Sequence, residues 1–328
     1  MTLRELGQTG LVVSPIGLGM AGLGRPAYMN RGRDTDFPEG RSVQEMAMRS
    51  FSVLDAARAR GVRYIDVARS YGQGEGFVAD WIQRSNVDPG EVTIGSKWGY
   101  TYVGAWRLDA PVHETKSHDI ATLDRQWEAT RKVLWSHLDL YQVHSVRPDS
   151  TLFEDAALLE RLHLLREQFG VHLGATVTGP DQASAIRRLM DLHVEGSRLF
   201  ETVQATYNPL EPSAAPALEE AHRAGMGVII KESLANGRLA PGRHDPEVAS
   251  LARAAVEREV PLDALVLALT LEQPWADVAL SGAVTCMQLE SNLKALTLQP
   301  DDEVRRLALA LREAPDAYWN ARSNLPWN

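Results

Sequence analysis

Asp66, Lys97 and His144 each stand directly after a short apolar segment, and Tyr71 lies five residues past Asp66. Because a charged group beside buried chain is poorly hydrated and must find a partner, we expect Asp66 and Lys97 to pair. Tyrosine, with a pKa of about 10, is a weak acid at neutral pH, but a neighbouring ammonium stabilises the phenolate and lowers that pKa. With His144 donating a hydrogen bond to a ligand oxygen, these side chains could pass a proton between Tyr71 and that oxygen.

Each of these residues also has a purely structural interpretation. Asp66 and Lys97 could form an ion pair that closes one end of the fold. Tyr71 could pack as a rim aromatic, and His144 could be a buried histidine with satisfied hydrogen bonds. Their arrangement at the ends of three predicted strands and in one loop favours a shared site over four separate structural roles.

Two other kinds of site fit the sequence less well. The nine histidines form no His-x-His or His-x-x-x-His pair, so we predict no dedicated metal site. His113 and His118 lie in a polar loop, where we expect exposure to solvent. A glycosidase needs two carboxylates about 5–9 Å apart, and Asp66 and Glu232 could supply them. Lys97 would neutralise Asp66, however, which leaves a barrel hydrolase as the weaker alternative.

The elements that must position these residues alternate regularly along the chain. Seven short apolar segments read as strands, at 64–67, 92–96, 138–143, 171–175, 200–205, 227–230 and 278–280, and 15–18 is the candidate for an eighth. Helical patterns separate them, at 42–60, 76–84, 119–135, 153–169, 181–192, 213–224 and within 246–273. Ser42 is placed to cap the first of these helices.

This alternation predicts a parallel sheet, because parallel strands need crossover helices. The strands are nearly continuous apolar runs, as expected where both faces are buried. Neither a linker nor a shift in composition divides the chain, and no Gly-x-Gly-x-x-Gly motif supports an open dinucleotide-binding sheet. We therefore predict one α/β domain over 1–328: a (β/α)8 TIM barrel with an N-terminal β-hairpin within 3–18 and extended loops, 20–41 and 98–118, over its C-terminal face.

The composition excludes several classes of protein. The 328 residues include 34 Lys+Arg and 43 Asp+Glu, a formal net charge of −9, which argues against binding nucleic acid through its phosphates. The one cysteine, Cys286, excludes internal disulfides. No apolar run approaches the length of a membrane span or a signal peptide, so we expect a cytoplasmic protein that binds neither membrane nor nucleic acid. An anionic ligand could still bind at a helix N-terminus.

Several segments of the chain match a known family in the family's order. They are 6–14 (Leu-Gly-Gln-Thr-Gly-Leu-Val-Val-Ser), 64–72 (Tyr-Ile-Asp-Val-Ala-Arg-Ser-Tyr-Gly), Ser96-Lys97, 139–144 (Asp-Leu-Tyr-Gln-Val-His), Gln204 with Asn208, and 281–293. Through these segments the chain resembles the aldo-keto reductase superfamily along almost its whole length. The resemblance implies a catalytic tetrad of Asp66, Tyr71, Lys97 and His144.

The resemblance also implies an activity. It is that of an NAD(P)H-dependent oxidoreductase, which reduces an aldehyde or ketone to an alcohol, or catalyses the reverse, by hydride transfer. Tyr71 is then the proton donor in reduction and the base in oxidation. A cofactor-binding regulatory or scaffold protein of the same fold is the alternative, since such subunits can keep the tetrad.

The implied cofactor is a nicotinamide dinucleotide lying across the barrel mouth. NADP(H) is favoured on family grounds, with NAD(H) as the alternative, because 282–292 contains no Lys or Arg to grip a 2′-phosphate. Lys231 stands where an aromatic residue often stacks on the nicotinamide, and Val177 stands where the family often has Asn. The implied cofactor contacts are Gly19, Met20, Asp66, Thr176, Gln204, Asn208, Lys231, Ser233, Leu234, Gly237, Gly282, Ala283, Gln288 and Asn292.

The predicted substrate is a small carbonyl compound. The loop after Lys97 carries three aromatic residues that we expect to line its pocket, Trp98, Tyr100 and Trp106. Such a rim suits a flat or partly apolar carbonyl compound, or stacking on the face of a sugar.

Overall fold

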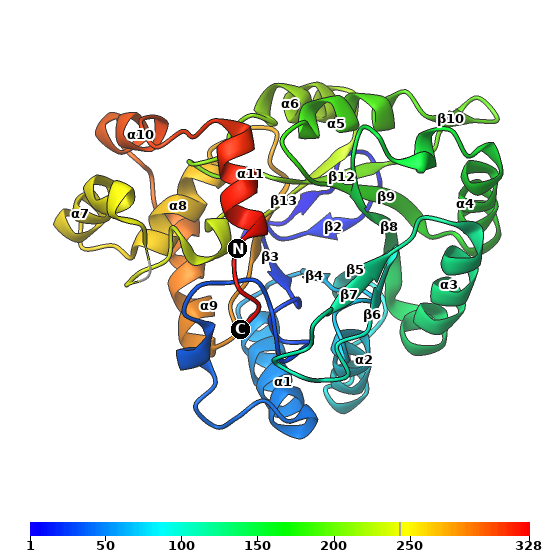
Figure 1. The fold of residues 1–328 in the computed structure, drawn as a ribbon, viewed down its shortest axis with the longest axis horizontal. Coiled ribbons are helices and arrows are strands. Elements are labelled where there is room, and N and C mark those ends of the chain that lie inside the picture. Colours follow the sequence, from blue (N-terminus) through cyan, green and yellow to red (C-terminus); the bar gives the residue numbers. More distant parts are fainter. Residues whose placement is uncertain (243) are drawn as a thin grey trace.

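Eight parallel strands close into a barrel in the order β12-β13-β14-β3-β4-β5-β8-β9, and helices surround it (Figure 1). The computed structural model describes residues 1–242 and 244–328, without the side chains of residues 33 and 34. The barrel strands are β3 (Ile16–Gly19), β4 (Tyr64–Asp66), β5 (Thr93–Trp98), β8 (Leu138–Val146), β9 (His172–Val177), β12 (Thr202–Thr206), β13 (Gly227–Lys231) and β14 (Val278–Ser281). The predicted (β/α)8 barrel is confirmed, with the segment at 15–18 as its first strand.

Several helices begin at a residue whose side chain caps them. Ser42 and Glu45 form a capping box at the start of the helix at Val43–Ala59, and Asp119, Asp155 and Asp181 each accept a backbone N–H at the starts of the helices that begin at Ile120, Ala156 and Gln182. The α-helices are α1 (Val43–Ala59), α2 (Gly74–Arg84), α3 (Ile120–Leu134), α4 (Ala156–Phe169), α5 (Gln182–Met190), α6 (Ala215–Arg223), α7 (Ala249–Glu257), α8 (Leu262–Leu271), α9 (Cys286–Leu293), α10 (Asp302–Leu309) and α11 (Pro315–Ser323).

Three barrel strands end two or more residues beyond the ends that the apolar pattern predicts. β5 runs on through Lys97, β8 through His144 and β9 to Val177. The apolar pattern stops before Lys97, His144 and Thr176, whereas in the structure Lys97 pairs with Asp66 and Thr176 bonds to the backbone of Ser145, and the strands continue. The functional side chains are therefore held on the strands themselves.

The N-terminal hairpin closes the opposite end of the barrel. Its strands, β1 (Arg4–Glu5) and β2 (Val12–Val13), pair antiparallel, and Leu6 and Val13 pack with Tyr64 among the buried residues there. Gly7 has a φ of 57°, and a Cβ at this position would lie 2.2 Å from the backbone of Gly227. A glycine is required for so close an approach.

The C-terminal face is covered by two structured segments. The loop after β5 forms a hairpin of β6 (Tyr100–Tyr102) and β7 (Glu114–Lys116). α11 lies over the barrel opening, and Trp327 beyond it pairs with Met29 (Figure 1). The ring of His113 is buried and stacks on Trp327 at 4.5 Å, so the prediction that His113 is exposed is wrong.

Within the described residues, the structure contains no helix both long and apolar enough to span a bilayer.

Candidate active site

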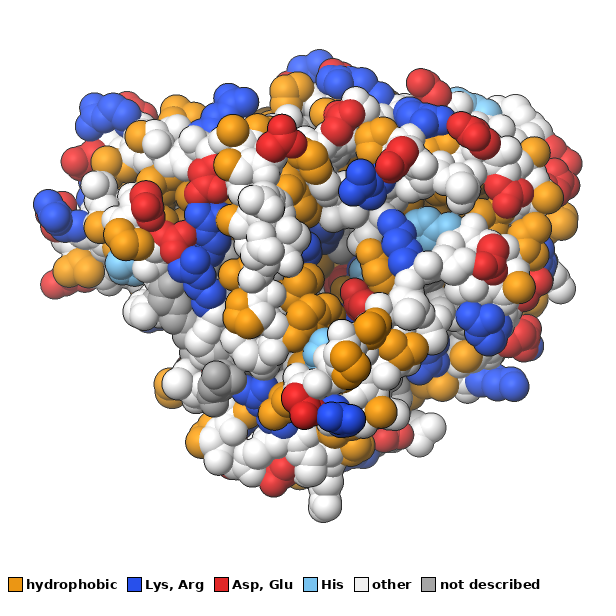
Figure 2. Space-filling view, in the orientation of Figure 1, with side chains coloured by type: hydrophobic (Ala, Val, Ile, Leu, Met, Phe, Trp, Pro, Cys, Tyr) orange, Lys and Arg blue, Asp and Glu red, His pale blue; other side chains and the backbone are white. Residues whose placement is uncertain are grey.

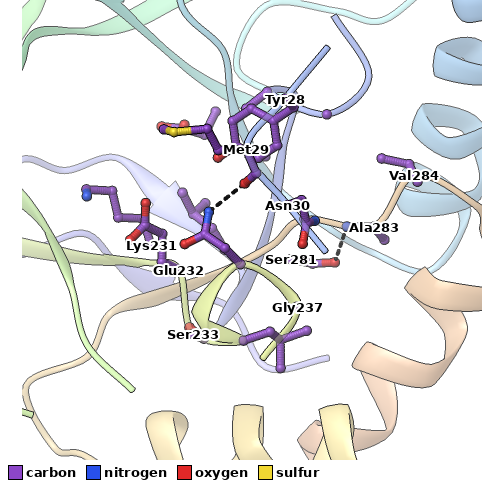
Figure 3. A pocket seen from close by; sticks show the side chains of 18 of the residues that line it. Tyr28, Met29, Asn30, Lys231, Glu232, Ser233, Gly237, Ser281, Ala283 and Val284 are labelled. Carbon is purple, nitrogen blue, oxygen red and sulfur yellow. Dashed lines mark hydrogen bonds between the residues drawn. The ribbon is translucent and has the colours of Figure 1, made fainter. Parts of the chain in front are cut away.

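A cavity of about 450 Å³ lies at the C-terminal ends of the barrel strands. Six different barrel strands contribute to its wall, through Gly19 of β3, Asp66 of β4, His144 of β8, Gln204 of β12, Lys231 of β13 and Ser281 of β14. This is the end at which the active sites of such barrels are built. Part of the lining is shown in Figure 3.

Lys97 connects the two other polar residues nearest to it, Asp66 and Tyr71. Its ammonium forms an ion pair with Asp66 and donates to the carbonyl oxygen of Val67 at 2.9 Å and to the Tyr71 hydroxyl at 3.3 Å. The Lys97 side chain is fully buried. Burial lowers the pKa of Lys97, and the charge of Asp66 opposes that effect. Lys97 itself does not line the cavity, so it acts on a ligand only through Tyr71.

Asp66 is held from the far side of the barrel as well. Its second carboxylate oxygen accepts a hydrogen bond from Gln204 Nε2 at 2.8 Å, and the Tyr64 hydroxyl lies 3.4 Å from the same oxygen. Buried charges of this kind need several partners to offset the loss of hydration. The carboxylate therefore has a fixed position, and it fixes that of the Lys97 ammonium.

Tyr71 presents a protonated hydroxyl to the cavity. Burial is the main cause that raises its pKa well above 10, and the negative charge of Asp66 adds to it. The Arg25 guanidinium, 5.2 Å from the centre of the Tyr71 ring, acts in the opposite direction. Before any ligand binds, Tyr71 is thus a phenol and a potential proton donor rather than a base.

His144 stands edge-on to two tyrosines at the cavity wall. Its ring centre lies 5.8 Å from that of Tyr71 and 5.0 Å from that of Tyr100. Burial, and then the charge of Lys97, holds the pKa of His144 well below 6.5, so the imidazole is neutral. Its Nδ1 has no hydrogen-bond partner among the described residues. A neutral imidazole can donate one hydrogen bond to a ligand oxygen.

His118 fixes the backbone at His144, and its titration should be visible in the stability of the protein. Its Nε2 donates to the His144 carbonyl oxygen at 2.9 Å. Burial is the first cause that lowers the pKa of His118 to about 4, with the charge of Lys116 second. The prediction that His118 is exposed is therefore wrong.

Because this folded-state pKa lies below the unfolded value of 6.5, His118 favours unfolding as the pH falls from 6.5 towards 4. We expect a loss of up to about 3 kcal/mol over that range. Urea unfolding of the wild type and of His118→Gln, measured from pH 7 to pH 4, should show a shallower pH dependence in the variant. If the free energy of unfolding falls equally with pH in both proteins, folding does not lower the pKa of His118.

Most of the predicted cofactor contacts lie on the cavity wall. In addition to Asp66, these are Gly19, Gln204, Lys231, Ser233, Leu234, Gly237, Gly282, Ala283, Gln288 and Asn292. Both polar atoms of the Gln288 side chain form hydrogen bonds within the protein: its oxygen accepts from the Val284 N–H, and its nitrogen donates to Asp36. Asn292 likewise bonds to Ser281 and Asp263.

Three predicted cofactor contacts do not line the cavity, and each has a structural role. Met20 is fully buried among apolar side chains. Thr176 accepts the backbone N–H of Ser145 at 2.7 Å and so supports the left-handed φ of 61° at Ser145. Asn208 accepts two backbone N–H groups through its side-chain oxygen and donates to the Tyr318 hydroxyl.

Two of the three aromatic residues predicted to line the substrate pocket, Trp98 and Trp106, do not line the cavity. Trp98 is fully buried in the apolar layer between strands and helices, because side chains alternate along β5 and its neighbour Lys97 faces inward. Trp106 donates its indole N–H to the carbonyl oxygen of Arg41 at 2.7 Å and packs on Phe77. Only Tyr100 lines the cavity, so the predictions for Trp98 and Trp106 are wrong.

Several charged residues and a tyrosine of the cavity are not predicted by the sequence pattern. The most prominent are Arg25, Tyr28, Glu114 and Arg322. Arg25 is buried, pairs with Glu114 at 2.7 Å, and lies over the rings of Tyr28, Tyr71 and Trp327. These residues come from the loop after β3, from the short strand β7 and from α11, none of which carries a barrel strand-end signal.

Comparison with known proteins identifies the class to which this barrel and its site belong. The sequence profile of the Aldo/keto reductase family matches residues 15–310, so the chain is a member of that family and an oxidoreductase. Aldo-keto reductase str7 of Strobilurus tenacellus is 26% identical over 249 residues, which are 74% of this chain but 64% of str7.

One further relative and one solved structure are similar over nearly the whole chain. The uncharacterized oxidoreductase YrpG of Bacillus subtilis is 25% identical, with 97% of this chain and 99% of YrpG aligned. The fold is similar to that of the aldo-keto reductase AKR11C1 from Bacillus halodurans in its holo form. That comparison gives a TM-score of 0.71 at 19% identity and covers 96% of this chain and 97% of the other.

Proposed function

We propose that the protein is an NAD(P)H-dependent oxidoreductase that reduces an aldehyde or ketone to an alcohol, or catalyses the reverse, with Tyr71 as the proton donor. The observation that supports it most strongly is the buried ammonium of Lys97, which contacts both Asp66 and the Tyr71 hydroxyl, two groups of residues that line the cavity. Family membership adds to this support.

The chain's own residues perform the acid–base part of the reaction. The Tyr71 hydroxyl and the neutral His144 both donate hydrogen bonds to the carbonyl oxygen and orient it. As negative charge develops on that oxygen, Tyr71 transfers its proton, and Lys97 stabilises the phenolate left behind. Asp66 keeps the Lys97 ammonium in place throughout. A bound nicotinamide dinucleotide supplies the hydride.

The cavity fits such a cofactor beyond the tetrad. A Cβ built on Gly282 would meet no atom within 4 Å, so this glycine borders open space. The Ser233 hydroxyl also lines the cavity (Figure 3); it is buried and has no hydrogen-bond partner among the described residues, as expected of a group that binds a polar ligand. NADP(H) is the favoured form by family resemblance, with NAD(H) as the alternative.

Gly282 offers a clean test of cofactor binding. Gly282 lines the cavity and is exposed, an added Cβ there meets no atom within 4 Å, and its φ lies outside the left-handed region, so Gly282→Val should leave the melting temperature within about 2 °C of the wild type. We expect the Kd for NADPH, measured by quenching of tryptophan fluorescence, to rise about tenfold or more, or about 1.4 kcal/mol. An unchanged Kd for both NADPH and NADH would place the cofactor elsewhere.

A further inference from the structure

Arg25 is a buried cation in the wall of the cavity, and no step of the proposed reaction uses it. Charged side chains are plentiful on the surface, also around the hollow beside α11 (Figure 2), whereas that of Arg25 is only 3% exposed. Its Nη1 donates to the Glu114 carboxylate of β7 at 2.7 Å and to the Ser70 carbonyl oxygen at 3.4 Å. The guanidinium is therefore fixed beside the residue that precedes Tyr71.

The ring of Tyr71 lies next to two cations. Lys97 Nζ is 4.8 Å and Arg25 Cζ is 5.2 Å from the centre of the ring. A cation over an aromatic face is attracted by the ring electrons, and the attraction is stronger where water is excluded. Because both cations are buried, both contacts help to fix the orientation of the ring.

The backbone next to Arg25 packs directly on the turn that carries Tyr71. The Gln73 N–H donates to the Gly24 carbonyl oxygen at 2.8 Å. A Cβ built on Gly24 would lie 2.4 Å from the Tyr71 carbonyl oxygen, so the two backbone segments are in direct contact. These contacts do not involve the guanidinium, and we expect them to survive its removal.

Stability alone does not explain the charge of Arg25. Removing a guanidinium and a carboxylate from water consumes much of what their attraction returns, and a well-packed apolar pair is often as stable. The rings of Tyr28 and Trp327, 5.2 Å and 4.9 Å from Arg25 Cζ, could also pack on an apolar side chain. The charge is better explained by its effect on a neighbour whose own charge changes, and Tyr71 is that neighbour in the proposed reaction.

The electrostatic effect of Arg25 on Tyr71 has a definite sign. Burial and then the charge of Asp66 raise the pKa of Tyr71, whereas Arg25 lowers it and Glu114 raises it. A cation lowers the pKa of a phenol because it stabilises the phenolate. The titratable and charged groups that face Tyr71 are Arg25, Tyr28, Tyr64, Asp66, Lys97, Glu114, His144 and Glu232.

We propose that Arg25 is a positioning residue for the proton transfer, which orients the Tyr71 ring together with Lys97 and stabilises the phenolate that the transfer leaves behind. The proposal rests on the proposed function, in which the Tyr71 O–H bond breaks and its proton joins the carbonyl oxygen, while the carbonyl carbon receives the hydride of the bound dinucleotide. Glu114 anchors the guanidinium and also weakens its effect. Arg25 and Glu114 thus act on the proton transfer with opposite signs.

The test follows the pH dependence of the reverse reaction, in which Tyr71 must be a phenolate to accept the proton. Oxidation of 1-propanol, benzyl alcohol, glycerol and xylose is measured with NADP+ and NAD+, and kcat/KM for the compound oxidised fastest is followed from pH 7 to pH 10.5. In Arg25→Met, we expect the rising part of this curve to move to higher pH by about one unit, or about tenfold in rate at fixed pH. In Glu114→Gln, it should move to lower pH.

Two further variants separate charge from structure. Arg25→Lys keeps a cation but loses the planar group, and its curve should lie within about 0.3 pH unit of the wild type. The matched control is Arg58→Met. Arg58 likewise pairs with one carboxylate, that of Glu91, and donates to one carbonyl oxygen, that of Ser85, both at 2.7 Å, but it does not line the cavity. Its loss should leave the curve unchanged, and the Kd for NADPH should stay within about threefold of the wild type in all four variants.

Three results would overturn the proposal: an Arg25→Met curve within about 0.3 pH unit of the wild type, equal displacement in Arg25→Lys and Arg25→Met, or a Glu114→Gln curve that moves to higher pH. If Arg25→Met does not fold, the direction in which Glu114→Gln moves the curve decides. The proposed function fails in a different way. In that case the cofactor binds and the wild type oxidises none of the four compounds at any pH.

Discussion

Tyr71→Phe should lower kcat for carbonyl reduction by about 10³-fold, within the 10²- to 10⁴-fold that a positioned proton donor contributes. Phenylalanine keeps the ring that packs against His144 and lies below Arg25, and it removes only the hydroxyl. The Kd for NADPH should change by less than about twofold, since a deleted hydroxyl of one wall residue leaves the cavity shape intact. Steady-state turnover and fluorescence titration of the same preparation measure both quantities.

The control for this variant is Tyr100→Phe. Tyr100 contacts His144 edge-on in the same cavity, but the hydrogen bonds of the Lys97 ammonium go to Asp66, Val67 and Tyr71. The ammonium beside Tyr100 is that of Lys116, which lies 5.7 Å from the centre of the Tyr100 ring. Removal of the Tyr100 hydroxyl should cost much less in kcat than the loss of the Tyr71 hydroxyl. Full activity of Tyr71→Phe, or an equal loss in both variants, would show that Tyr71 is not the proton donor.

Lys97→Met should impair both activity and folding. It leaves the Asp66 carboxylate buried without its cation, and breaking a buried pair in this way costs about 3–5 kcal/mol of stability. It also removes the charge that stabilises the Tyr71 phenolate, so kcat should fall by about 10²-fold or more. Urea unfolding and steady-state kinetics at pH 7 measure the two losses separately.

A second substitution separates the structural from the catalytic part of this effect. In Asp66→Asn with Lys97→Met, no buried charge is left unpaired, so most of the lost stability should return while the activity does not. Arg305→Met, which breaks an exposed pair with Glu272, serves as the reference and should cost less than about 1 kcal/mol. If the double variant is as unstable as Lys97→Met, the unpaired Asp66 carboxylate is not the cause of the lost stability.

The sequence predicts the barrel well because the signal for a parallel strand is local. Continuous apolar runs such as that before Asp66 are found only where both faces of a strand are buried, and Ser42 marks a helix start by its chemistry alone. The tetrad is predictable for a related reason. Asp66, Lys97 and His144 stand at strand ends, and the topology of a barrel brings strand ends together.

The rest of the cavity depends on tertiary contacts that no local pattern encodes. Trp98 and Tyr100 stand two residues apart, yet only Tyr100 reaches the cavity, because the chain turns at Gly99, with a φ of 112°, between β5 and β6. Arg322 comes from a helix at the end of the chain and meets Glu232 90 residues away in sequence. Asn208 fits the family pattern for a cofactor contact, but its amide is used entirely inside the protein.

The most direct test of the proposed function follows the hydride itself. The purified protein is incubated with an aldehyde or sugar substrate and with NADPH or NADH that carries deuterium at both C4 positions of the nicotinamide ring, and the alcohol is analysed by mass spectrometry. We predict one deuterium on the carbinol carbon of the product, formed in the wild type and reduced about 10³-fold in Tyr71→Phe. Bound cofactor with no deuterated alcohol from any carbonyl compound would contradict the proposal and favour a cofactor-binding scaffold.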